Sequence, residues 1–194
     1  MKRLLLIFIF FPYFANAKNS HADSIYSFLQ QFFYNWSYAD TNTANFYIII
    51  NRPQYGLSNY NNGTFSTRAR YISRDTIASI FSKSDSIEIV QQISNDRKFY
   101  FKNGKLQKVK FISEKKLDRE MGTDVRYHWD NFYKKMHENG YYCISIPIFY
   151  DNGNKAAFYF DYNCGWLCGY GYWSIYEKIN GKWVKQTVFS QWVS

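Results

Sequence analysis

The residues with the clearest potential for chemistry lie close together near the C-terminus. Cys164 and Cys168 enclose the tripeptide Gly-Trp-Leu, and Gly169-Tyr170-Gly171 follows directly. The apolar runs on either side predict a β-hairpin whose apex is closed by the two cysteines. The glycines predict unusual backbone angles at this apex, because glycine adopts positive φ at little cost. We therefore expect the rest of the chain to be organised around this hairpin.

A disulfide between Cys164 and Cys168 is the chemistry that we expect there. The chain has three cysteines, so at most one pair forms within it, and these two flank one short loop. Closing so short a loop removes little chain entropy, so the bridge should shape the loop more than it stabilises the fold. Cys143 lies in an apolar run and is predicted to be a buried free thiol. The sequence alone leaves open a bridge from Cys143 to either of the others.

Other chemistries need partners that the sequence does not supply as a recognisable set. Two thiolates three residues apart would need two further metal ligands, and the histidines available are His21, His128 and His137. Redox enzymes favour a Cys-x-x-Cys motif at a helix N-terminus, whereas three residues separate Cys164 from Cys168 in an expected hairpin. The sequence also contains no Gly-x-Ser-x-Gly elbow, the motif that presents a catalytic serine. The sequence therefore assigns no catalytic residue, metal or cofactor, and it favours a non-enzymatic protein. The alternative is a small enzyme with a pocket between sheet and helices, near polar groups such as Tyr127, His128 and Asp130.

Aromatic and basic side chains predict a binding surface on the hairpin. The chain contains 19 Tyr, 18 Phe and 6 Trp, most of which should belong to the core and to cross-strand pairs. Those expected to contact a partner are Trp166, Tyr170 and Tyr172, with Lys178 and Lys182 placed for anionic groups. We expect an interaction module whose partner is a protein, in the manner of an immunity protein, or an anionic polymer of the cell envelope. A carbohydrate-binding aromatic platform is a narrower alternative, and nucleic acid is not expected.

The first 17 residues predict a secretory signal peptide. Lys2 and Arg3 precede an apolar run over 4–14, and Ala15-Asn16-Ala17 forms a small-residue cleavage pattern. The run is shorter than the about 20 residues of a membrane-spanning helix, and no later segment comes close. We expect cleavage after Ala17, a single domain over 18–194, and a location in the periplasm or outside the cell. The mature chain would carry a net charge of +7, which attracts anionic partners.

Hydrophobic periodicity predicts two or three helices in the first part of the chain. Apolar residues recur at spacings of three and four over 23–37, which predicts an amphipathic helix. A shorter helix is expected over 73–81, ended by the serine-rich run 82–86. A third is expected over 123–140, where Thr123 would cap the start and Gly140 the end.

Strand patterns dominate the second part. Alternation over 87–93 predicts a half-buried strand, and Asn103-Gly104 predicts a hairpin between 98–102 and 105–111. The remaining strands are expected over 46–50, 142–149, 156–162, 172–179 and 183–192, with a second Asn-Gly turn at Asn180-Gly181. Early helices and a late meander indicate an α+β fold, in which two or three helices pack on a twisted antiparallel sheet.

The C-terminal third resembles a group of uncharacterised exported bacterial proteins. The likeness is carried by Trp129, Phe132, Ser-Ile-Pro-Ile-Phe from Ser145, Cys-Gly-Trp-Leu-Cys-Gly-Tyr-Gly from Cys164, Asn-Gly-Lys-Trp from Asn180 and the closing Trp-Val-Ser. This resemblance implies an exported protein and a fold style, with no activity attached. The order of elements is also similar to that of nuclear-transport-factor-like cones, a fold shared by enzymes, ligand binders and immunity proteins.

Overall fold

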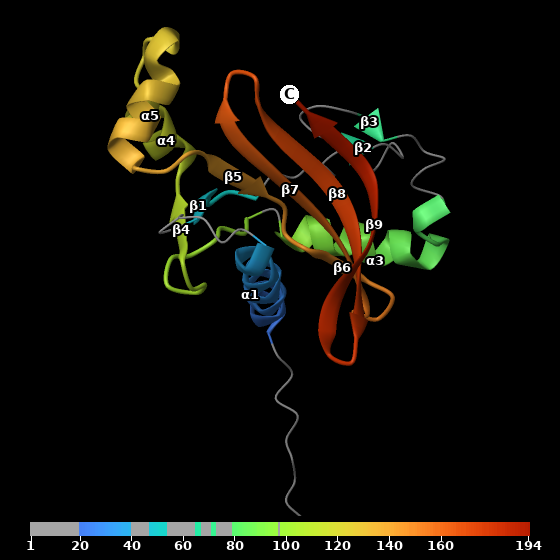
Figure 1. Ribbon diagram of the computed structural model, residues 1–194. Helices are drawn as coiled ribbons and strands as arrows, with labels where there is room; N and C mark the ends of the chain where they lie inside the picture. Colours follow the sequence, from blue (N-terminus) through green and yellow to red (C-terminus); the bar gives the residue numbers. More distant parts are fainter. Residues whose placement is uncertain (1–19, 40–46, 54–64, 67–70, 73–78, 97) are drawn as a thin grey trace, which may run out of the picture.

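The protein is an α+β fold in which helices pack on both faces of a sheet (Figure 1). The computed structural model describes residues 20–39, 47–53, 65–66, 71–72, 79–96 and 98–194. The predicted signal peptide and most of the helix predicted over 73–81 lie outside the described residues. Within these ranges, no helix is both long enough and apolar enough to cross a membrane.

The described helices and strands alternate along the chain before a final run of strands. The helical elements are α1 (His21–Ala39), α3 (Lys83–Asp96), α4 (Glu114–Met121), the 3₁₀ turn η2 (Val125–Tyr127) and α5 (His128–Met136). The main sheet contains β1 (Tyr47–Ile50), β4 (Val109–Ile112), β5 (Tyr141–Ile144), β6 (Ile148–Tyr150), β7 (Lys155–Gly165), β8 (Cys168–Ile179) and β9 (Lys182–Val193). A separate two-stranded pair joins β2 (Phe65–Ser66) and β3 (Tyr71–Ile72).

The sheet is mixed, whereas the sequence predicted an antiparallel one. Its order is β4-β1-β5-β7-β8-β9, and β6 pairs with β7 beside β5. The strands from β5 to β9 are antiparallel, and they form the predicted C-terminal meander. β1 runs parallel to both β4 and β5, because each of these strands follows a long connection that includes a helix.

The two faces of the sheet bury different helices. On β7, Phe158 and Phe160 pack into a core cluster with α1, whereas Ala157 and Tyr159 pack into a cluster with α3. The same alternation continues on β5, where Cys143 joins a cluster with α4 and α5. We call these the α1 face and the opposite face. Successive strand residues point to opposite sides, so each strand between the two layers is apolar at nearly every position.

The predicted strand over 87–93 is wrong, because these residues lie in α3. Ser82 and Asp85 form a reciprocal capping box, in which Asp85 N donates to Ser82 Oγ (3.2 Å) and Ser82 N donates to Asp85 Oδ2 (2.9 Å). The serine-rich run that was expected to end a helix therefore begins one. Ile89 is fully buried and Ile93 is partly buried. Residues four positions apart lie on the same face of a helix and also on the same face of a strand, so the alternating pattern fitted a strand as well.

The predicted hairpin around Asn103-Gly104 is also wrong. Gly104 has positive φ, as expected for such a turn, but residues 98–108 form no strand. The Asn103 side chain instead binds the backbone of Phe111, accepting from its N–H (2.7 Å) and donating to its carbonyl (3.0 Å). This amide satisfies one side of β4, and β1 pairs with the other. Phe101 and Leu106 are buried in the α1-face cluster.

The predicted helix over 123–140 is shorter than expected and is preceded by α4, which the sequence analysis missed. Ser113 caps α4, and Asp124, one residue after the predicted cap, caps η2. α5 ends at Met136, and the left-handed backbone of its C-cap, His137 (φ 56°), supplies the termination expected of Gly140. The predicted strand over 142–149 is divided into β5 and β6, whereas the last three predicted strands and the Asn180-Gly181 turn are present.

Candidate binding site at the hairpin apex

The β7–β8 hairpin ends in a disulfide-closed loop, Cys164 to Cys168, which we call the apex loop. The bridge joins Cys164 and Cys168 across a Cα–Cα distance of 5.0 Å, within the range that disulfides allow, and Cys143 is a buried free thiol. In the strand register Gly165 pairs with Cys168, and pairing is irregular between Asn163 and Gly165. The predicted pairing of the cysteines is therefore present.

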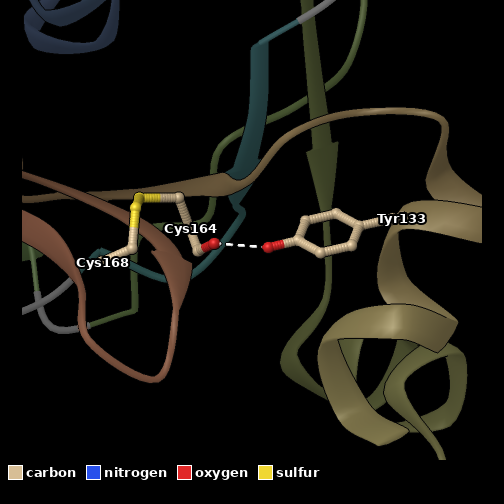
Figure 2. Close-up of a disulfide and its surroundings, with 3 residues drawn as sticks. All are labelled: Tyr133, Cys164 and Cys168. Carbon is tan, nitrogen blue, oxygen red and sulfur yellow. Dashed lines mark hydrogen bonds between the residues drawn. A yellow bond between two sulfur atoms is a disulfide. The ribbon is translucent and has the colours of Figure 1, made fainter.

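The apex loop is held against α5. The Tyr133 hydroxyl donates a hydrogen bond to the carbonyl oxygen of Cys164, and Figure 2 shows this bond beside the disulfide. The His128 ring stacks on the Trp166 ring, with 6.1 Å between centroids and 20° between planes. α5 itself is anchored by Phe132, which is fully buried in the cluster of the opposite face. A helix fixed to the sheet thus supports the loop at two points.

The two residues at the tip expose apolar surface. Leu167 is 87% exposed and Trp166 is 59% exposed, although Trp166 lies against His128. Tyr127 and Tyr133 are also exposed, the first next to His128 in the chain and the second bonded to the loop. We call Tyr127, Tyr133, Trp166 and Leu167 the apical surface. Tyrosine and tryptophan supply large contact areas at small entropic cost, so a rigid cluster of this composition is suited to binding.

The other predicted binding residues do not join Trp166. Tyr170 and Tyr172 are half-buried on the α1 face, where both pack against Phe160, at ring distances of 6.2 Å and 5.5 Å. Lys178 and Lys182 flank the Asn180-Gly181 turn at the other end of β8. β8 runs for 12 residues from Cys168 to Ile179, a span of roughly 35 Å. The predicted set is thus divided among three places.

Trp192 explains the glycines that follow the apex loop. Neither Gly169 nor Gly171 has the positive φ that the sequence analysis invoked. A Cβ atom on Gly171 would lie 2.7 Å from the Asp161 Cβ and 2.8 Å from Trp192 Cε2. One on Gly169 would lie 3.0 Å from the Tyr162 carbonyl oxygen and 3.2 Å from Trp192 Cη2. Close approach of the Trp192 ring and of neighbouring strand atoms, and not backbone freedom, therefore requires glycine here.

A buried carboxylate lies beneath this contact. Asp161 accepts hydrogen bonds from the backbone N–H of Cys143 (3.1 Å), from the Tyr159 hydroxyl (2.9 Å) and from the Asn163 amide (2.8 Å). Trp192 in turn donates its indole N–H to the Tyr159 hydroxyl (3.1 Å). Burial raises the pKa of Asp161, and the hydrogen bonds partly offset that rise. Asp161 therefore links β5 to β7 below the apex, and the Tyr159 hydroxyl extends this network to Trp192 on β9.

The residues named for an enzyme do not gather in a pocket. Tyr127 and Asp130 are exposed, and His128 lies under Trp166. The described residues that line a pocket come instead from α1, β8 and β9: Phe28, Phe32, Asn35, Tyr172, Tyr176, Trp183 and Lys185. In the part of the chain that the structure describes, no three His, Cys, Asp or Glu side chains gather as a metal site would require.

The disulfide at the hairpin apex was predicted from the sequence, whereas the residues that support the apex loop were not. Tyr133, His128 and Trp192 act on the apex from other elements, and no local pattern connects them to it. Comparison of the chain with known protein families, with curated proteins and with solved structures finds no match.

Proposed function

We propose that this protein is an exported, non-enzymatic interaction module that binds a protein partner through the apical surface. The observation that carries the proposal is the exposure of Trp166 and Leu167 on a loop that is braced by a disulfide and by α5. A loop fixed in one conformation loses little entropy on binding, so its apolar area contributes efficiently to affinity. The disulfide favours an oxidising compartment, which agrees with the predicted signal peptide.

A protein partner fits this surface better than an anionic polymer does. The charged groups beside the apical surface have both signs: Arg126 pairs with Asp124 at 2.8 Å, and its guanidinium lies 5.6 Å from the Tyr127 ring centroid. A polyanion would need a row of cations alongside the aromatic residues. Lys178 and Lys182 lie at the far end of β8, and Lys135, on α5 beside the surface, lies 4.0 Å from the Glu120 carboxylate. Aromatic residues surrounded by mixed charges are typical of protein interfaces.

The first stage of the test identifies the partner. A photo-crosslinking amino acid is placed at Leu167 and, as a matched control, at Ile87, which is 58% exposed on α3 and lies far from the apex loop. Both proteins are exported in the native host and irradiated. We expect a protein adduct that forms from position 167 and not from position 87. Adducts that are the same from both positions, or the absence of any adduct from position 167, would contradict the proposal.

The second stage measures affinity for the purified partner. Trp166→Ala should weaken binding by about 30-fold or more, as truncation of a central interface tryptophan does. Ile87→Ser removes a comparably exposed apolar residue from α3 and should change affinity less than about twofold. Circular dichroism and melting temperature should match the wild type for both variants. Equal affinities for wild type and Trp166→Ala would overturn the proposal, and binding of anionic-lipid vesicles or lipopolysaccharide in place of a protein would do so as well.

A further inference from the structure

A pocket on the α1 face has the construction of a small-molecule site. It is about 180 Å³ in volume, and its described lining comes from three elements. Phe28, Phe32 and Asn35 follow one stripe of α1, at helical spacings of four and three. Tyr172 and Tyr176 lie on one face of β8, and Trp183 and Lys185 on the same face of β9. None of these residues belongs to the apical surface, so the inference goes beyond the proposed function.

The apolar walls of the pocket are fixed by packing. Phe28 meets Tyr176 and Trp183 edge to face, with ring centroids 5.1 Å and 5.3 Å apart. α1 is also tied to β9, because the Gln31 side chain accepts a hydrogen bond from Trp183 N (2.8 Å). Edge-to-face aromatic packing and a direct helix-to-strand bond hold the walls in place without a ligand. The pocket is therefore largely preformed, as ligand sites usually are.

The polar groups of the pocket are suited to an anion. Lys185 is exposed at its rim, with Nζ 5.2 Å from the Tyr172 ring centroid, and no acidic residue is part of the described lining. Lys185 has no ion-pair partner among the described residues, nor do the hydroxyls of Tyr172 and Tyr176 have hydrogen-bond partners there. Burial raises the pKa of Tyr172 to about 12 and also raises that of Tyr176. Both hydroxyls thus remain protonated at neutral pH and can donate to an oxyanion.

We infer that this pocket binds a small monoanion with one apolar ring, such as an arylacetate, with the ring among the aromatic walls and the carboxylate at Lys185. The volume sets the size, since a cavity of about 150 Å³ accepts one benzene ring and the remaining space suits a short acidic substituent. The negative charge of the ligand follows from one lysine without an ion-pair partner and from hydroxyl donors, with no carboxylate among the described lining residues.

The test uses the purified protein and two probes of nearly equal size. Phenylacetate carries the negative charge, and 2-phenylethanol is its neutral counterpart. Isothermal titration and saturation-transfer NMR should show that phenylacetate binds with a Kd of about 1 mM or lower. We expect 2-phenylethanol to bind at least about fivefold more weakly. The inference would be overturned if phenylacetate does not bind at about 10 mM, 10-fold above the expected Kd. Equal affinity for both probes would also overturn it.

Variants then assign the site. Lys185→Gln should weaken phenylacetate binding about 10-fold and leave 2-phenylethanol binding unchanged, whereas Lys182→Gln, an exposed lysine on the same strand, should change neither. Asn35→Phe fills the pocket from an exposed helix position and should abolish binding of both probes with no change in circular dichroism. Unchanged affinity in both Lys185→Gln and Asn35→Phe would place the probe elsewhere and refute the assignment. Trp166→Ala should bind phenylacetate as the wild type does, so failure of the apical proposal and failure of this one are distinguishable.

Discussion

The two turns at the ends of β8 lie at opposite ends of the meander (Figure 1), and they are stabilised by different means. Both are two-residue connections: Trp166-Leu167 joins β7 to β8, and Asn180-Gly181 joins β8 to β9. Asn180 and Gly181 have φ values of 50° and 78°, the positive pair that a tight hairpin turn prefers. Neither Trp166 nor Leu167 has positive φ, and their turn is instead closed by a disulfide and supported by Tyr133.

The two turns differ in whether their residues are explained by the fold alone. The Asn180-Gly181 turn contains the residues that the backbone requires, and the tryptophan that follows it, Trp183, is only 9% exposed. The apex loop contains two large apolar residues that the turn does not require and that folding leaves uncovered. A disulfide and a hydrogen bond from Tyr133 on α5 hold this loop in place. Such an arrangement is expected where a surface is presented to a partner.

The largest expected effect is a difference in stability between variants of the tryptophans at the two turns. Trp183→Ala should lower the free energy of unfolding by about 3 to 5 kcal/mol, because it removes a buried ring that packs on Phe28 and Phe149. Trp166→Ala should lower it by about 0.5 kcal/mol, since most of that ring faces solvent. Urea unfolding monitored by circular dichroism measures both. A loss of several kcal/mol for Trp166→Ala would show that the apex is part of the core and would remove the contrast.

The next effect compares one substitution at both ends of β8. Gly171→Ala should cost about 3 kcal/mol, at the upper end of overpacking costs, because its Cβ would meet the Trp192 ring and Asp161. Gly181→Ala meets no atom within 4 Å, so its cost should be about 1 kcal/mol from the positive φ alone.

The rescue experiment sharpens this prediction. Combining Gly171→Ala with Trp192→Ala should restore part of the loss, because the second change removes the ring that the new methyl group would meet. The same Trp192→Ala change should give no rescue of Gly181→Ala. Strictly additive costs in the Gly171→Ala pair, measured by a double-mutant cycle, would refute the close-contact explanation.

A smaller effect is expected when the brace of the apex loop is removed. Replacing Cys164 and Cys168 by serine should lower the free energy of unfolding by about 2 kcal/mol, the value that loop closure predicts for so short a ring. The larger consequence should be loss of partner binding, because the loop no longer holds Trp166 in place. Thiol labelling of the unreduced, denatured wild type should tag Cys143 alone. Labelling of all three cysteines would contradict the disulfide.

The smallest expected effect is a pH dependence near the Asn180-Gly181 end. His21 Nε2 lies 2.9 Å from the buried Asp96 carboxylate, and this hydrogen bond is the main cause that raises the pKa of His21 above 6.5. The His21 ring also meets Phe149, which packs on Trp183. A raised pKa in the folded state means that the contribution is complete below pH 6.5 and is lost as pH rises through the folded value.

Because His21 is about half exposed, solvent screening limits this contribution to no more than about 1 kcal/mol. The unfolding free energy of the wild type should therefore fall more between pH 5.5 and pH 9 than that of His21→Gln. Identical pH profiles for the two proteins would show that the pair contributes nothing.

The sequence determined the parts of this protein that depend on short-range chemistry. The α1 stripe, the last three strands, the Asn180-Gly181 turn and the Cys164–Cys168 pair each follow from residues close together in the chain. Hydrophobic periodicity and turn preference act over a few residues, so these features were predictable. The prediction failed over 87–93, where the same isoleucines fit a strand or a helix, and the capping box at Ser82 was the decisive signal that the sequence analysis did not use.

Only the tertiary structure decided which surfaces these elements present. The side-chain amide of Asn103 supports one edge of β4 by bonding to the backbone of Phe111. The other edge of β4 pairs with β1, a strand that is distant in the sequence. Tyr172 was predicted to face a partner beside Trp166, but α1 covers that face of β8 and makes it one wall of a pocket. The grouping of Tyr133 with Cys164, and of Lys185 with Asn35, joins residues more than 30 and 100 positions apart. Such groupings depend on how helices dock on the sheet, a free-energy balance over the whole core that no local pattern contains.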